Sequence, residues 1–178
     1  MLYTGKGDSG TTKVFGCDQK RISKSSELPE ALGALDELNA FLGFAKMRAH
    51  ESLPQIAHTL RDVQEALFIV QAQTAGADKK LAEGAVGKVE EMVGNIEKEI
   101  PPITGFSIAG GTELSALLDV SRTFARRAER RLTAVADARL REFPPETKAY
   151  MNRLSSLLFA LARLANHKAG VKEENPRY

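Results

Sequence analysis

The segment from Tyr3 to Lys24 combines residue types that suit the binding of a phosphate group. It reads YTGKGDSGTTKVFGCDQKRISK and shows no apolar period. Its glycines let the backbone turn sharply and approach a ligand closely, and its lysines and hydroxyls can donate hydrogen bonds to phosphate oxygens. The residues concerned are Thr4, Gly5, Lys6, Gly7, Ser9, Gly10, Thr11, Thr12 and Lys13. The pattern indicates an anion-binding segment, although an irregular N-terminus rich in turn-forming residues fits it as well.

This segment is not a P-loop of the Walker A type. Such a loop places a glycine five residues ahead of Gly-Lys-Ser/Thr, between a buried strand and a helix. Here Lys6 is followed by Gly7, and only five residues precede that lysine. If the segment binds a nucleotide, another fold must present it.

A second candidate anion site lies in the basic stretch at 121–131, which reads SRTFARRAERR. Its five arginines repel one another on a helix unless an anion lies nearby. Arg122, Arg126 and Arg130 recur at four-residue spacing, so their guanidinium groups can converge on one polyphosphate. A solvated basic face is one alternative and a nucleic-acid contact is another, but a net charge of +2 gives no support to the second.

Three further residues are candidates for a site, and each also has a simpler structural explanation. Asp36 lies among small residues that allow a close neighbour, where its carboxylate can pair with an arginine, but for an isolated acid simple exposure to water is the favoured interpretation. Asn152 is a mediocre helix former, which makes it either a ligand contact or a plain surface residue. Phe106 lies in the loop before Gly110-Gly111, where a lone aromatic residue more often packs back into the core.

No acid–base or metal-binding arrangement can be recognised in the sequence. His50, His58 and His167 show no ligand spacing with each other or with a cysteine. No Ser-His-Asp or Cys-His arrangement can be argued. The single cysteine, Cys17, excludes an intrachain disulfide and fits a reducing compartment.

The composition predicts one globular domain located in the cytoplasm. The chain has 178 residues, of which 43% are hydrophobic and 27% are charged, enough for one core without metal or disulfide crosslinks. Its apolar stretches are interrupted well before the roughly 20 residues that a membrane span needs. The start, Met1-Leu2-Tyr3, does not resemble a signal peptide. We therefore expect no membrane contact.

Apolar residues recur at helical spacing from Pro29 almost to the end of the chain. They predict helices over about 29–50, 56–70, 86–100, 114–135 and 150–164. Pro101-Pro102 and Pro144-Pro145 interrupt this pattern, and Thr112 is suited to cap the fourth helix. No alternating run is long enough to need a sheet. The predicted fold class is therefore all-α, a bundle of five helices.

Six motifs in one order make the chain resemble the PduO-type ATP:cob(I)alamin adenosyltransferases over nearly its whole length. They are YTGKGDSGTT at 3–12, Arg21-Ile-Ser-Lys24, ALGALDELNAFLG at 31–43, FSIAGGT at 106–112, SRTFARRAERR at 121–131 and NRLSSLLFALARLANHKAG at 152–170. Such an ordered set is far more specific than an arginine-rich helix alone.

The resemblance implies a single domain over 1–178 that assembles as a homotrimer and binds ATP between adjacent subunits. Its parts would be an N-terminal ATP-binding segment over 1–28, a helical bundle over 29–170 and a tail over 171–178. Glu129 would also lie near Mg²⁺. The ATP-binding residues that the resemblance implies are Thr4, Gly5, Lys6, Gly7, Thr12, Lys13, Lys24, Arg126, Glu129, Arg130 and Asn152.

The resemblance also implies a reaction and the residues that act in it. Cobalt in its one-valent state would attack the 5′-carbon of ATP and expel triphosphate, giving adenosylcobalamin. The protein would then contribute orientation and charge stabilisation rather than a general base. Arg126 and Phe106 are the expected catalytic residues, and Phe106 matches the aromatic residue that borders the corrin. Asp36 and Arg122 match a salt bridge across the subunit contact.

The chain departs from the family pattern in two places. The stretch at 25–29 replaces an acidic turn, and Ala109 stands where a proline is usual, which bears on loop stiffness more than on the chemistry. A bundle that senses ATP or cobalamin without turnover and an arginine-rich RNA-binding bundle are the alternatives, but the retained N-terminal loop and Arg126 favour the enzyme. Its expected partners are ATP, Mg²⁺, cob(I)alamin, a cobalamin-dependent acceptor enzyme and a reductase, with no nucleic acid.

Overall fold

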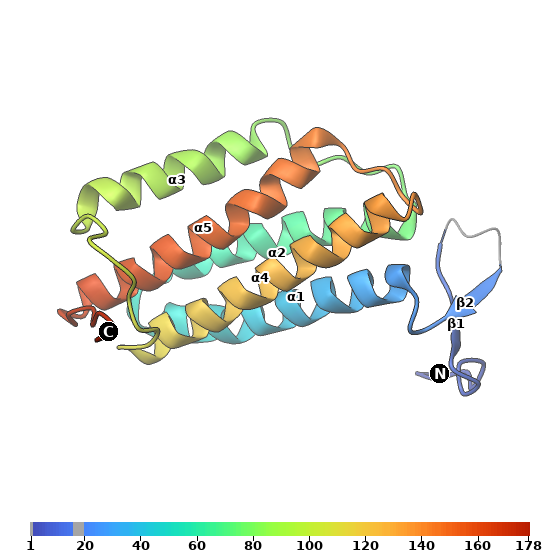
Figure 1. Cartoon of the computed structure of the whole chain (residues 1–178), viewed down its shortest axis with the longest axis horizontal. Coiled ribbons are helices and arrows are strands. Elements are labelled where there is room, and N and C mark those ends of the chain that lie inside the picture. The colour runs from blue at the N-terminus through green and yellow to red at the C-terminus, as the bar shows by residue number, and fades with distance from the viewer. Residues whose placement is uncertain (1, 16–19) are drawn as a thin grey trace.

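The computed structural model describes residues 2–15 and 20–178, and most of it is a bundle of helices. The five helices are α1 (Glu27–Ser52), α2 (Pro54–Ala75), α3 (Ala85–Glu99), α4 (Glu113–Asp137) and α5 (Pro145–Lys168). Helix α1 packs against α2 and α4, α4 also packs against α5, and α3 lies along the outer side of α5 (Figure 1). The predicted helical bundle is confirmed.

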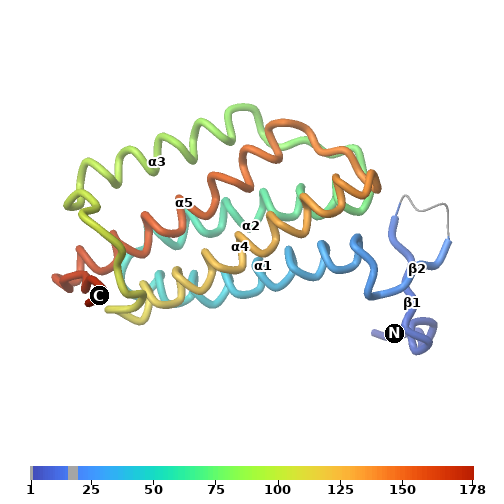
Figure 2. Tube along the Cα trace, viewed as in Figure 1, coloured from blue at the N-terminus to red at the C-terminus, as the bar shows by residue number. Residues whose placement is uncertain are grey.

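The course of the chain separates the two ends of the bundle. The Cα trace places the N-terminal segment beyond the end at which α1 begins (Figure 2). The C-terminal tail lies at the opposite end, beside the loop that connects α3 to α4 (Figure 2). Two segments that carry candidate site residues, the N-terminal segment and the α3–α4 loop, are thus far apart within one chain.

A small antiparallel sheet precedes the helices, and the apolar pattern did not predict it. Strand β1 (Thr11–Lys13) pairs with β2 (Arg21–Ser23), with Thr12 opposite Ile22. Strands of three residues are too short to display an alternating pattern, so sequence periodicity carries no signal for them. Cys17 belongs to residues 16–19, outside the described part of the chain.

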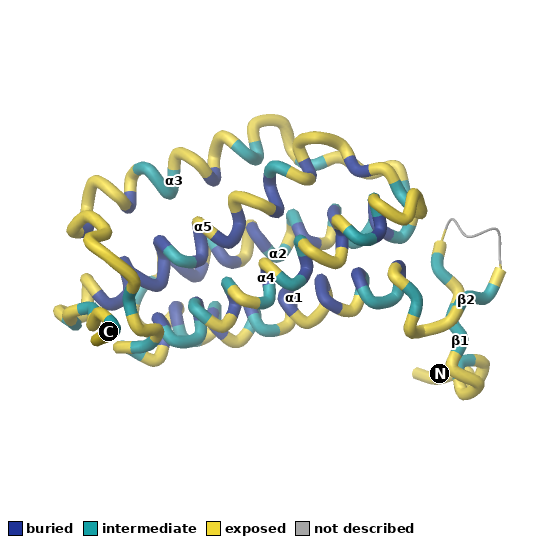
Figure 3. Tube along the Cα trace, viewed as in Figure 1, coloured by how far each residue is buried: buried dark blue, intermediate teal, exposed yellow. Residues whose placement is uncertain are grey.

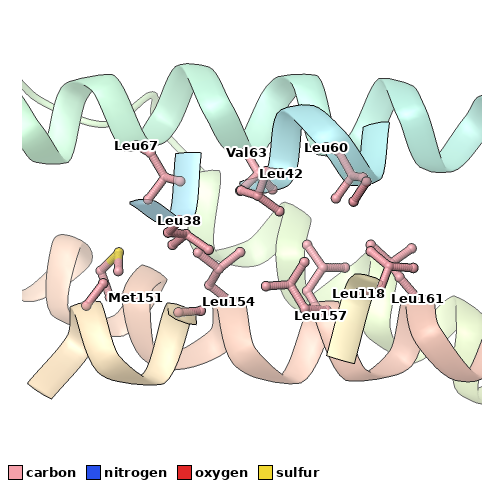
Figure 4. Close-up of a cluster of buried hydrophobic side chains, with 14 of the residues drawn as sticks. Leu38, Leu42, Leu60, Val63, Leu67, Leu118, Met151, Leu154, Leu157 and Leu161 are labelled. Carbon is pink, nitrogen blue, oxygen red and sulfur yellow. The ribbon is translucent and has the colours of Figure 1, made fainter. Parts of the chain in front are cut away.

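The core lies between α1, α2, α4 and α5, on the faces that the apolar period marks. Figure 4 shows leucines from all four helices meeting in its centre. Among the leucines labelled in Figure 4, the fully buried ones are Leu38, Leu42, Leu60, Leu67, Leu118, Leu154 and Leu157. Buried positions follow the inner faces of these helices, whereas the N-terminal segment and the loop before α4 are largely exposed (Figure 3). Among the described residues, no helix has both the length and the apolar character needed to cross a bilayer.

Local signals set the helix ends that position the site. Thr112 caps α4 as predicted, since its hydroxyl accepts a hydrogen bond from the Ser115 amide at 3.1 Å. Helix α1 begins at Glu27, slightly earlier than Pro29, because proline in the first turn loses no helical hydrogen bond. Helix α2 ends at Ala75, and the next residue, Gly76, takes the left-handed conformation with φ of 102°.

Candidate active site

The arginines of α4 divide between two sides of the helix. Arg127 forms an ion pair with Glu37 of α1. Arg131 pairs with Glu30 of the same helix at 3.2 Å. Acids of a neighbouring helix therefore neutralise these two arginines, and they do not belong to the anion-binding stripe.

Arg122, Arg126 and Arg130 present their charges elsewhere. Arg122 contacts Asp119 at 3.3 Å and lies 5.8 Å from the ring centroid of Phe159. Arg126 and Arg130 are exposed, and neither has an ion pair or hydrogen-bond partner within the described residues. Of the predicted stripe, these two are the cations available to an anionic ligand.

A hollow of about 560 Å³ brings Arg122 and Arg126 together with Phe106. Its remaining described lining comes from the α3–α4 loop and from α5, namely Ile103, Gly105, Ser107, Ser155, Ser156 and Phe159. Phe106 is 78% exposed, so it does not fill the core. The hollow thus joins the available cation of Arg126 to an aromatic wall, which suits a ligand with an anionic part and a flat apolar part.

Glu129 and Asn152 contact each other beside the arginine stripe. The Asn152 Nδ2 donates to Glu129 Oε1 at 2.9 Å. Arg153 in turn donates to Asn152 Oδ1 at 2.7 Å and pairs with Glu90 of α3. The second oxygen of Glu129 has no protein partner in the described structure. Within the same residues, no group of three metal-binding side chains occurs. The Glu129 carboxylate alone could therefore contact only a cation that is held mainly by the phosphates of a bound ligand.

Arg21 fixes the shape of the N-terminal segment, a role that the sequence analysis did not assign. Its guanidinium donates to the main-chain oxygen of Lys6. It also donates to the main-chain oxygen of Thr11 at 2.7 Å and to the hydroxyl oxygen of Thr11 at 2.8 Å. Gly5 and Gly10 have φ of 69° and 78°, which favours glycine at these turns. Its place in the motif Arg21-Ile-Ser-Lys24 was the available signal.

Lys6, Lys13 and Lys24 of this segment are exposed. The segment itself lies beyond the end of the bundle (Figure 1). Lys24 Nζ lies beside Gly7, where a Cβ atom would come within 3.1 Å of it. The two strands pack mainly against each other, and none of these residues lines the hollow. Within one chain, the structure therefore does not bring Arg126 together with Thr4, Gly5, Lys6, Gly7, Thr12, Lys13 and Lys24.

Asp36 and Arg122 likewise do not pair within the chain. Asp36 is exposed on α1, and the recorded acidic partner of Arg122 is Asp119. Near Asp36 on the same helix, Phe44 and Met47 are 52% and 62% exposed. Large apolar side chains gathered on one helix face mark a contact surface more often than a solvated one.

Comparison with known proteins adds a consistent set of relatives. Residues 2–165 match the family model described as cobalamin adenosyltransferase. A corrinoid adenosyltransferase from Bacillus subtilis is 34% identical over 176 residues, which cover 96% of this chain and 89% of the relative. A corrinoid adenosyltransferase from Homo sapiens is 32% identical over 183 residues, which cover 97% of this chain and 72% of the relative.

The fold of this chain is also similar to that of a solved structure from this group of enzymes. It is a variant of a PduO-type ATP:corrinoid adenosyltransferase from Lactobacillus reuteri, complexed with cobalamin and ATP. Its TM-score to this chain is 0.91 at 28% sequence identity, and the alignment covers 99% of this chain and 97% of that one.

Proposed function

Because this chain belongs to the cobalamin adenosyltransferase family and transfers the adenosyl group of ATP to a corrinoid, we propose that its active site is completed between subunits of a homotrimer. The observation that carries the proposal is the separation of the N-terminal segment from Arg126 within one chain. A neighbouring copy that lays its segment against the hollow would supply the missing half of a polyphosphate site.

The exposed apolar face of α1 supports this assembly. Asp36 and Met47 are eleven residues apart, about three helical turns, and Phe44 lies three residues before Met47, so all three lie toward one side of α1. A second copy packed there would cover both apolar side chains and bring an arginine to Asp36. Arg122 of that copy is the proposed partner.

The proposed ATP site combines donors from both copies. Lys6, Lys13 and Lys24 of one segment would face Arg126 and Arg130 of the neighbouring α4, with cations around the triphosphate. Main-chain and hydroxyl donors of Thr4, Gly5, Gly7 and Thr12 would complete the cradle, and Asn152 would contact the nucleotide. Glu129 would lie near Mg²⁺, which when bound neutralises charge on the phosphates.

The reaction does not require the protein to act as a general base. The one-valent cobalt of the corrinoid supplies both electrons of the new cobalt–carbon bond, and the bond from the 5′-carbon to oxygen breaks with its electrons leaving on triphosphate. The described lining of the hollow contains no carboxylate, histidine or cysteine to act as a general base. Arg126 would stabilise the leaving group, and Phe106 would border the corrin and exclude water.

Mixed trimers test whether the site is shared. Lys6→Ala and Arg126→Ala should each be nearly inactive alone, but co-expression with two affinity tags should restore activity. In a random mixture about one quarter of the sites of a cyclic trimer combine an intact Lys6 with an intact Arg126 from different chains. Steady-state adenosylation of one-valent cobalamin measures this fraction.

A matched mixture serves as the control for complementation. Lys6→Ala mixed with Lys13→Ala should gain nothing, because both lesions lie in the same half of the site. Isolated two-tag trimers of Lys6→Ala and Arg126→Ala that stay inactive would show that one chain supplies the whole site.

A double-mutant cycle tests the proposed pair of Asp36 and Arg122. Asp36→Asn and Arg122→Gln should each weaken the trimer because each leaves a charge unpaired, whereas the double variant should lose less than their sum. We expect a coupling of about 0.5–3 kcal/mol in the trimer equilibrium measured by sedimentation. Asp119→Asn, which removes the partner of Arg122 within the chain, is the control. Simple additivity of Asp36→Asn and Arg122→Gln would argue against a contact between them.

The proposal also covers the location of the enzyme, the parts of the chain and its protein partners. We propose a cytoplasmic enzyme, with residues 1–28 as the ATP-binding segment, 29–170 as the bundle and 171–178 as a tail. The reaction supports two partners: a reductase that generates one-valent cobalt, and a cobalamin-dependent enzyme that takes up the product.

A further inference from the structure

Arg163 is a charged side chain of α5 that lies almost wholly inside the protein, 8% exposed. Its guanidinium donates to both carboxylate oxygens of Glu173 in the C-terminal tail, at 2.8 Å and 3.0 Å. It also donates to the main-chain oxygen of Pro101 at 2.8 Å. A buried guanidinium is tolerated only when its donors are paired. One side chain therefore anchors both the tail and the start of the loop that carries Phe106.

The tail continues from this anchor to the middle of the loop. The Ile108 amide donates to the main-chain oxygen of Glu174 at 2.8 Å. Asn175 Nδ2 donates to the main-chain oxygen of Phe106 at 2.7 Å. Both contacts hold the loop by its backbone, so the ring of Phe106 stays available to a ligand. In the described structure no backbone–backbone hydrogen bond joins two residues of 101–111 to each other.

The far end of the loop is held separately by Asn166, which lies one turn after Arg163. Asn166 donates to the Gly110 oxygen at 2.8 Å and accepts from the Thr112 amide at 2.9 Å. A Cβ atom at position 111 would lie 2.6 Å from the Asn166 oxygen, so Gly111 is needed for this close approach. The loop is thus fixed at its start by Arg163, at its end by Asn166 and in its middle by the tail.

The middle of the α3–α4 loop is not held by packing against the core. A second hollow, of about 510 Å³, lies against the loop and is lined by Pro101, Arg163, Glu173 and Asn175 among others. Ile103, Gly105, Ser107 and Phe159 line both this hollow and the one that contains Arg126. The loop therefore runs between two open spaces, and hydrogen bonds from the tail are what restrict its movement.

We infer that the C-terminal tail acts as a strap that sets the position of Phe106, with Arg163, Glu173 and Asn175 as positioning residues. This inference rests on the proposed role of Phe106 at the corrin. The carboxylate of Glu173 holds the tail to the buried guanidinium, and Asn175 with the Glu174 carbonyl holds the loop. The strap keeps the ring directed at the hollow before the corrinoid enters.

Hydrogen exchange tests the strap directly, without reference to the reaction. In Glu173→Gln the tail loses the charged half of its anchor, so exchange at the Ile108 amide should become at least about tenfold faster in the full-length protein. Glu174→Gln is the matched control, because this neighbour contacts the loop through its carbonyl and not its side chain. Asn175→Ala provides a second variant, since Asn175 is exposed and its loss leaves Arg163 paired. Unaltered exchange at Ile108 in Glu173→Gln and Asn175→Ala overturns the strap.

Electron paramagnetic resonance of bound two-valent cobalamin with ATP tests the consequence for Phe106. The four-coordinate fraction should fall several-fold in Glu173→Gln and Asn175→Ala and stay at the parent level in Glu174→Gln, with the KM for ATP nearly unchanged in all three. A purely structural defect would instead lower the melting temperature and raise that KM.

The outcomes separate the strap from the proposed function. If Phe106→Ala lowers the four-coordinate fraction but both tail variants keep it, the positioning role is wrong and the role of Phe106 stands. If Phe106→Ala itself keeps that fraction, the proposed role of Phe106 is wrong, and the positioning role falls with it.

Discussion

Arg126→Ala should lower kcat/KM for adenosyl transfer by about 100-fold to 1,000-fold, the range typical of removing one donor from a developing oxyanion. The physical reason is that the Arg126 guanidinium lines the hollow, is exposed and has no partner among residues 2–15 and 20–178. Negative charge increases on the triphosphate as its bond to carbon breaks, so this contact strengthens in the transition state. Most of the loss should therefore appear in kcat rather than in the KM for ATP.

Arg131→Ala is the matched control for this measurement. Arg131 lies on the same helix and is also exposed, but it pairs with Glu30 of α1 instead of facing the hollow. An exposed ion pair contributes at most about 1 kcal/mol to stability, so activity should change little. Initial rates with chemically reduced cobalamin would compare the two variants. An Arg126→Ala enzyme within twofold of the parent would exclude the proposed role.

Phe106→Ala should lose most of its activity, more than about tenfold, when two-valent cobalt must be reduced on the enzyme. Reduction to the one-valent state is difficult while an axial ligand donates electron density to the metal. An apolar ring against the corrin face excludes water and the cofactor's own base, which favours the four-coordinate state. When one-valent cobalt is supplied ready-made, this contribution is no longer needed, and the loss should be only a few-fold.

Thermal unfolding distinguishes this role from a structural one. Truncating a core phenylalanine costs about 3–5 kcal/mol, but Phe106 is 78% exposed, so the melting temperature should hardly change. Phe68→Ala is the control, because Phe68 is 62% exposed on α2, outside the hollow, and should affect neither reduction nor stability. A Phe106→Ala protein that unfolds much earlier yet keeps the four-coordinate signal would show that the ring belongs to the core.

Local patterns in the sequence were sufficient for the helices and the family. The apolar period marks which face of each helix is buried, proline pairs interrupt it, and Thr112 carries its own capping signal. These are interactions between residues close together in the chain, so they can be read without knowing the fold. The ordered motifs likewise identified a corrinoid adenosyltransferase, which the family match confirms.

Only the tertiary structure decided which arginines of α4 have acidic partners and which are available to a ligand. Helical spacing set Arg122, Arg126 and Arg130 apart in the sequence, but it did not show which arginines have acidic partners. Packing of α1 against α4 gives Arg127 and Arg131 such partners, 90 and 101 residues away. No local pattern encodes such a contact, because it depends on which helix faces meet. The hairpin of three-residue strands was missed for the related reason that its signal is shorter than the pattern that would reveal it.

The position of Phe106 depended on tertiary structure in the same way. From the sequence, a lone loop aromatic fitted the core better than a site, since burial of a loop residue cannot be read from a period. In the structure the ring is exposed, and Arg163, Asn166 and the C-terminal tail form hydrogen bonds to the backbone of its loop. Sequence thus determined the helices and the family, whereas long-range packing and hydrogen bonds decided which of the candidate residues share one hollow.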